Sequence, residues 1–212
     1  MRPWVRQYAI ALTGLYACAA FTVITPFYPV VALRSGIPSS FIGLIFSAFP
    51  ISSIITSMFL PKTMLLIGRH LTLILSLFLI GSGCILVSFI ESLSPTMALI
   101  ISLTSRIITG SGAACGVISS SSILSSDYPE KLQSLSAVIE FFIGLGTIIG
   151  PLAGSILYSL GGFALSCRII GLSVYSYIPV IFLLLGKARK HVVKEKIKIS
   201  IWEVCKKPVI LT

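Results

Sequence analysis

The chain has 212 residues, of which 56% are hydrophobic and only 10% are charged, and its formal net charge is +10. A soluble globular domain usually carries about 25% charged residues, so a soluble fold could not cover this much apolar surface, whereas a lipid bilayer is itself an apolar solvent. Most basic residues stand outside the long apolar runs or in the short gaps between them, which indicates the loops of a membrane protein and argues against a nucleic-acid-binding face.

Six apolar stretches follow one another, and each is about the 20 residues that a helix needs to cross the hydrocarbon core of a bilayer. They cover residues 8–33, 40–61, 71–90, 97–119, 132–158 and 163–186. Turn-forming and charged residues fill the gaps, and Gly161-Gly162 predicts a tight turn before the last stretch. This order predicts an all-α integral membrane protein with a six-helix transmembrane bundle over residues 1–186.

The first stretch has two prolines near its outer end, Pro26 and Pro29, which are expected to break the regular helix. Tyr16 and Phe21 supply aromatic surface that could contact a cationic or apolar substrate in a cavity. The basic start also resembles a secretory signal, but the apolar run continues to Val31, beyond the roughly 7–15 residues of a signal. We therefore interpret this stretch as the first transmembrane helix.

Three charged residues fall inside the stretches, where charge is rare and marks a functional candidate. Arg106 lies about halfway along the fourth stretch, Glu140 in the inner part of the fifth and Arg168 in the outer part of the sixth. Arg106 and Glu140 have opposite signs on consecutive antiparallel helices, so they could pair or share one cavity. In one interpretation Glu140 exchanges protons as solvent access alternates; in the other, the two form a static ion pair that sets the helix register. Arg168 is close enough to the interface to snorkel.

Glycine is concentrated in the fifth stretch. Gly146, Gly150 and Gly154 recur every four residues and form one smooth stripe, which lets a neighbouring helix approach closely. Pro151 removes one backbone hydrogen bond and is expected to bend the helix. The stripe predicts a close contact that serves either as a hinge between moving bundles or as ordinary glycine packing.

Charge counting predicts that both termini lie in the cytosol. Thirteen basic residues would then be inside, namely Arg2, Arg6, Lys62, Arg69, Lys131 and eight after residue 186, and Arg34 would be the single one outside. Residues 187–212 are expected to form a basic cytosolic linker leading towards a seventh helix, held at the lipid surface or solvated.

Catalytic and metal-binding patterns are absent from the sequence. The five cysteines are scattered without the spacing of metal ligands, so no metal or other cofactor is expected. No nucleophile and base stand in a recognisable pattern, so an enzyme is not expected.

Two motifs on consecutive stretches carry a family resemblance. The fourth stretch has Arg106, Gly110 and Gly112 in an RxxxGxGxA pattern, and the fifth has Gly146, Gly150-Pro151 and Gly154 in a GxxxGPxxG pattern. In this order they resemble the N-terminal half of the major facilitator superfamily. The resemblance implies two inverted three-helix repeats, at about 8–90 and 97–186, in half of a twelve-helix carrier.

Further resemblances indicate one branch of this superfamily. The runs Pro26-Phe-Tyr-Pro29 and Glu140-Phe-Phe-Ile-Gly144 are similar to those of the vesicular amine and polyamine transporters. The loop between the second and third stretches keeps Gly68 and Arg69 of the superfamily's inner motif, but Leu65 stands where that motif has an aspartate. The inner gate that this aspartate would fasten is therefore in question.

The resemblance implies secondary transport of an organic cation, an amine or polyamine, exchanged for protons. It further implies a cavity lined by the first, fourth and fifth helices, an intracellular vesicle membrane as one location, and a second transporter half supplied in cis or in trans. The alternative is a non-transporting membrane subunit or a non-functional truncated fragment. Neither interpretation involves nucleic acid.

Overall fold

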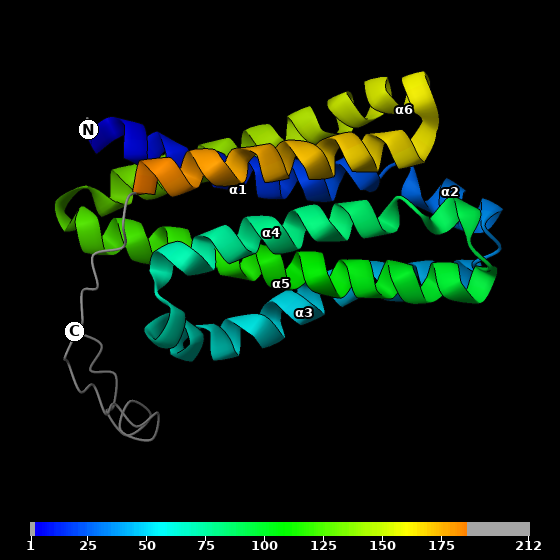
Figure 1. Ribbon diagram of the computed structural model, residues 1–212, viewed down its shortest axis with the longest axis horizontal. Helices are drawn as coiled ribbons and strands as arrows, with labels where there is room; N and C mark the ends of the chain where they lie inside the picture. The colour runs from blue at the N-terminus through cyan, green and yellow to red at the C-terminus, as the bar shows by residue number, and fades with distance from the viewer. Residues whose placement is uncertain (1–2, 186–212) are drawn as a thin grey trace, which may run out of the picture.

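The computed structural model describes residues 3–185, and these residues form an almost entirely helical bundle (Figure 1). The helices are α1 (Pro3–Ile24), α2 (Tyr28–Arg34), α3 (Ser39–Ile67), α4 (Arg69–Val87), α5 (Pro95–Asp127) and α6 (Leu132–Leu185), with short 3₁₀ turns η1 (Ile90–Ser92) and η2 (Pro129–Lys131). The expected tail at 187–212 lies outside the described residues.

Proline and glycine set the boundaries of these helices. α1 ends at Ile24 and α2 begins at Tyr28 with Pro29 in its first turn, so the predicted break in the first stretch is confirmed. Gly68 adopts a φ of 95° between α3 and α4, a backbone conformation that favours glycine. Inside α6, Gly162 has a φ of 73°, which confirms the predicted turn and divides α6 into two arms.

Five of the helices in the described part are long and apolar enough to cross a membrane. The last of these, α6, doubles back at Gly161-Gly162, so its two arms provide two passes and the bundle has the six passes expected from the sequence (Figure 1). The start of α1 and the end of α6 lie at the same end of the bundle (Figure 1). Two repeats related by inversion remain a prediction.

The bundle is built from two groups of neighbouring helices. α1 packs along α6, while α5 packs against both α4 and α3, and α4 also contacts α6. Buried apolar side chains at these contacts form one core cluster, which includes Ile10, Tyr28, Leu77, Phe163 and Ile181. Although α5 and α6 are consecutive in the chain, they touch only slightly.

The outer face of α3 is strongly apolar and uncovered within the bundle. Ile54 is 62% exposed, Met58 71% and Phe59 63%. In water such a face would be an aggregation hazard, whereas hydrocarbon or another apolar helix matches it. Together with the spans, this surface shows a multi-pass membrane protein.

Candidate functional site

Arg106 lies at the centre of the candidate site. It projects from the middle of α5 and is only 2% exposed. Its guanidinium carbon lies 5.5 Å from the ring centre of Phe21 on α1, 5.6 Å from that of Tyr28 on α2 and 5.1 Å from that of Phe46 on α3. Three aromatic rings therefore surround the buried cation, and cation–π attraction offsets part of the cost of removing it from water.

Glu140 does not pair with Arg106 within residues 3–185, which disagrees with the static ion pair, one of the two interpretations of these residues. Glu140 is exposed on the first arm of α6, and no ion pair of Glu140 is formed within residues 3–185. Its neighbour Ile139 is buried, and the side chains of Ile139 and Ile143 approach Gly14 of α1. α6 packs on α1 and barely touches α5. The exposed Glu140 carboxylate on α6 is therefore not brought next to the buried guanidinium of Arg106 on α5.

The glycine stripe of α6 lies directly against α1, as its spacing predicted. A methyl group at Gly146 would lie 2.6 Å from the Leu15 carbonyl oxygen, and one at Gly154 would lie 3.0 Å from that of Val23. At Gly150 it would collide with the Thr22 hydroxyl, which donates a 3.2 Å hydrogen bond to the Gly146 carbonyl oxygen. The two backbones are therefore in contact along the whole stripe, and Pro151 lies within this seam.

Gly110 and Gly112 place α5 between its two neighbours. A side chain at Gly110 would overlap the Phe49 carbonyl and Ser52 of α3. A side chain at Gly112 would lie 3.0 Å from the Ser76 carbonyl oxygen of α4. The two glycines thus let α5 approach helices on opposite sides, and this close packing holds Arg106 at a fixed depth.

A polar cluster joins three helices at the end of the bundle where α1 begins. Arg6 of α1 forms a 2.8 Å ion pair with Asp127 at the end of α5, the only ion pair within residues 3–185. The same guanidinium lies 2.9 Å from Nε2 of His70 on α4. Beside it, Arg69 donates a 3.2 Å hydrogen bond to the Ser122 carbonyl oxygen of α5. We call Arg6, His70 and Asp127 the end cluster.

The end cluster contains a carboxylate that the sequence motifs did not point to. Leu65 stands where the superfamily's inner motif has an aspartate, and Asp127, at the end of α5, is a separate carboxylate that pairs with Arg6. Sequence reasoning did not find this pair, because Arg6 and Asp127 are separated by about 120 residues of chain and only the bundle brings them together.

Arg6→Gln is expected to loosen the start of α1 without unfolding the bundle. A partly exposed ion pair contributes at most about 1 kcal/mol, and local opening would then become about fivefold more frequent. Hydrogen exchange of the α1 amides in lipid nanodiscs measures this opening. Lys62→Gln is the matched control, because Lys62 is exposed on α3 and makes no contact with the cluster. Equal hydrogen exchange in both variants would show that the end cluster does not stabilise the start of α1.

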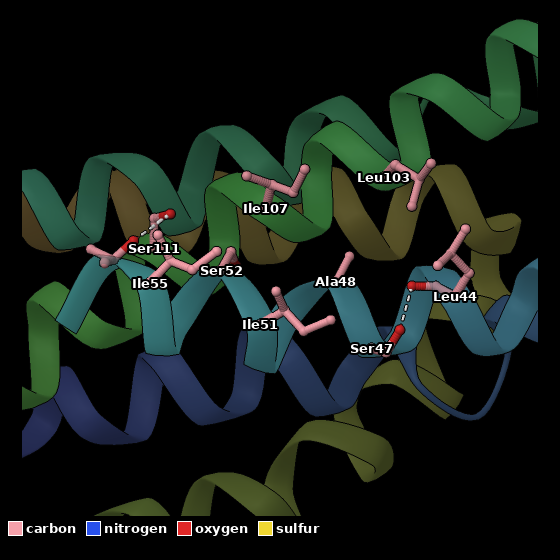
Figure 2. Close-up of a pocket in the computed structure, with 10 residues that line it drawn as sticks. Leu44, Ser47, Ala48, Ile51, Ser52, Ile55, Leu103, Ile107 and Ser111 are labelled. Carbon is pink, nitrogen blue, oxygen red and sulfur yellow. Dashed lines mark hydrogen bonds between the residues drawn. The ribbon is translucent and has the colours of Figure 1, made fainter. Parts of the chain in front are cut away.

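A groove of about 340 Å³ lies between α3 and α5 (Figure 2). Leu44, Ile51 and Ile55 of α3 face Leu103 and Ile107 of α5 across it. Its polar lining consists of hydroxyl groups, and Thr56 donates a 2.9 Å hydrogen bond to Ser111. Because no charged side chain lines the groove, it suits apolar groups and supplies no counter-charge for an amine.

The two aromatic residues expected in a substrate cavity do not line this groove. Tyr16 stacks on Tyr177 with ring centres 4.7 Å apart, and Phe21 packs on Phe49 at 4.4 Å. The cation near the Phe21 ring is the protein's own Arg106. A cavity lined by the first, fourth and fifth helices therefore stays a prediction for the protein with both halves.

Arg168 behaves as its position suggested. It is exposed on the second arm of α6, where its Nε lies 3.3 Å from the Ser88 hydroxyl and its guanidinium carbon 5.2 Å from the Phe89 ring centre. A charge near the end of a span with such contacts can remain at the interface, so nothing assigns it to the buried site.

A bundle of this kind, with apolar outer faces, glycine-lined seams and one deeply buried cation, defines a multi-pass α-helical membrane protein. Residues 10–211 match the family model described as Major Facilitator Superfamily, and the chain belongs to this superfamily of transporters.

Three curated relatives are named MFS-type transporter SLC18B1. The mouse protein (Mus musculus) is 27% identical over 172 residues, which are 80% of this chain and 37% of the relative. The rat (Rattus norvegicus) and human (Homo sapiens) proteins are 27% and 26% identical over the same share of the chain and 38% of their own lengths. The matched part of the chain therefore spans well under half of each relative, and these matches support the resemblance to the vesicular amine and polyamine branch.

Proposed function

We propose that this chain is the N-terminal half of a secondary carrier that exchanges a cationic amine or polyamine for protons. The observation that carries the proposal is the superfamily match, which extends from residue 10 to residue 211 and includes both glycine motifs. The amine follows from the similarity to the vesicular amine and polyamine branch. Proton coupling is inferred from Glu140, the one acidic side chain within the transmembrane part of the first arm of α6.

Glu140 is proposed to carry the coupling proton. It is exposed on the bundle and has no ion-pair partner within residues 3–185, so its carboxylate faces either lipid or the second half of the carrier. A charge facing hydrocarbon is costly, so we propose that Glu140 meets solvent or an amine in turn as access to it alternates. A carboxylate that alternates in this way can exchange a proton for a cation.

The second half is supplied in cis or in trans, and the relatives' greater length supports this requirement. The apolar outer face of α3 and the first arm of α6 are the surfaces that it would cover. In this arrangement both termini are cytosolic, the two repeats are related by inversion, and the glycine seam between α1 and α6 moves as one rigid unit. Arg106 remains a predicted coupling residue that acts without direct contact with Glu140.

The proposal is tested by transport in proteoliposomes that contain the intact gene product to which this chain belongs. With an acidic lumen and radiolabelled spermidine outside, we expect accumulation that a protonophore abolishes. A gradient of one pH unit supplies about 1.4 kcal/mol per proton, so each exchanged proton should support about tenfold accumulation. A correctly folded protein that accumulates no spermidine or monoamine under this gradient would instead support a non-transporting membrane subunit.

A further inference from the structure

Two nitrogen atoms of the Arg106 guanidinium have no hydrogen-bond acceptor in the described part of the chain. Its Nε and Nη2 are buried, and no acceptor within residues 3–185 bonds to either atom. The aromatic rings offset part of the charge, but they provide no oxygen atoms for these N–H groups. A buried guanidinium is normally hydrogen-bonded as well as charge-compensated, because an unpaired one is among the costliest groups to bury.

Two buried hydroxyl groups beside Arg106 have no hydrogen-bond partner other than one another within residues 3–185. Ser102 precedes Arg106 by one helical turn, so both side chains lie on the same face of α5. The Tyr28 hydroxyl faces that of Ser102, and the Tyr28 ring lies against the guanidinium. Beyond their approach to one another, neither hydroxyl has a hydrogen-bond partner within the described residues. Four donor groups on three residues are therefore gathered in one buried region between α1, α2, α3 and α5.

The charge of this region determines whether it can bind a cation or an anion. The acidic residues of the described part, Glu91, Asp127, Glu130 and Glu140, are all exposed, so none of them neutralises Arg106. A cationic amine would be repelled by the guanidinium. A compact anion with one negative charge would accept hydrogen bonds from Nε, Nη2 and the hydroxyls, and it would balance the single positive charge.

We propose that Arg106, Tyr28 and Ser102 form a binding site for one compact monovalent anion, a halide or a small carboxylate, inside this half of the protein. The proposal concerns Arg106 as an anion-binding residue and does not rest on the proposed transport function. Phe21 and Phe46 are partly exposed on one side and lie against the guanidinium on the other. Their rings therefore stand between the guanidinium and the outside of the bundle. Leu103 and Ile107, which flank Arg106 on α5, line the nearby groove, and this groove is the proposed route of entry (Figure 2).

The test measures thermal unfolding of the intact protein in lipid nanodiscs while chloride or acetate replaces the bulky anion isethionate at constant ionic strength. A saturable rise in melting temperature is expected with the anion that binds, since a ligand of the native state stabilises it by mass action. A response to chloride indicates a halide site, and a response to acetate indicates a carboxylate site. Equilibrium binding of the radiolabelled anion gives the stoichiometry, which is expected to be one per chain.

Variants separate anion binding from a structural role of the same residues. Arg106→Gln is expected to abolish the anion response and, in isethionate alone, to melt no lower than the wild type, because it removes an unpaired buried charge. Tyr28→Phe and Ser102→Ala each remove one hydroxyl and are expected to weaken anion binding about tenfold. Arg168→Gln, which removes an exposed arginine, should keep the full response.

Two results would overturn the proposal. One is a wild-type melting temperature that is the same in chloride, acetate and isethionate, which would show that water and the aromatic rings are the only partners of Arg106. The other is an anion response that Arg106→Gln retains, which would place the anion elsewhere.

Discussion

Glu140→Gln is expected to abolish accumulation of an amine driven by a pH gradient, in the intact protein reconstituted in liposomes. Glutamine keeps the size of the side chain and some of its hydrogen bonding but cannot release a proton at any working pH. Accumulation should therefore fall from about tenfold per exchanged proton to none. Downhill exchange of labelled for unlabelled amine, which needs no net proton movement, should partly survive.

The yield of folded Glu140→Gln protein should match that of the wild type. A static ion pair with Arg106 would predict a loss of yield, because breaking such a pair leaves a buried charge at a cost of about 3–5 kcal/mol. Glu140 and Arg106 form no such pair in the described part of the chain, so an accompanying Arg106→Gln should restore nothing. Glu130→Gln is the matched control, since Glu130 is exposed in η2 just before the same helix. Normal proton-driven accumulation in Glu140→Gln would remove Glu140 from the mechanism.

Gly150→Leu is expected to separate α6 from α1 and to reduce the folded protein severely. Any side chain there meets the Thr22 hydroxyl and the Ala19 carbonyl oxygen, and a backbone cannot retreat as a flexible side chain can. Overpacking of this kind costs about 1–3 kcal/mol and occasionally more, so the equilibrium constant for folding should fall by about fivefold or more. Size-exclusion chromatography and thermal unfolding in detergent measure the loss.

Gly144 provides a matched control on the same helix. It is exposed, and nothing lies within 4 Å of the position that a side chain would take. Gly144→Leu should therefore fold like the wild type. Combining Gly150→Ala with Thr22→Ala should recover part of the stability lost in Gly150→Ala, because it removes the hydroxyl nearest to the new methyl group. Equal losses at Gly144 and Gly150 would mean that helix propensity, not the seam, explains the effect.

Local chemistry explains why the helices could be predicted well. A run of about 20 apolar residues has few alternatives to a transmembrane helix, since lipid cannot satisfy exposed backbone groups. The breaks at Pro26–Pro29 and at Gly161-Gly162 follow from residues that cannot continue a helix or that alone tolerate its interruption. The predicted glycine stripe likewise needed only the helical period to place three glycines on one face.

The contacts between charges could not be predicted in the same way. The sequence places Arg106 and Glu140 at suitable depths on consecutive helices, yet α5 and α6 are not close neighbours, because α6 packs on α1 and α4. Arg106 meets aromatic rings from α1, α2 and α3, and Arg6 of α1 meets Asp127 at the end of α5. These partners depend on the rotation and neighbours of each helix, which packing alone determines.

The sequence by itself determined that residues 3–185 form apolar helices long enough to cross a membrane, where these helices break, and which glycines let them touch. These properties depend on hydrophobicity, on backbone freedom and on a fixed helical repeat, all of which belong to single residues and their near neighbours. Only the tertiary structure decided that Glu140 is exposed, that no acceptor within residues 3–185 bonds to Nε or Nη2 of Arg106, and that Arg6, His70 and Asp127 meet. Such contacts join residues far apart in the chain, and the close packing of α5 and α6 against their neighbours is what brings them together.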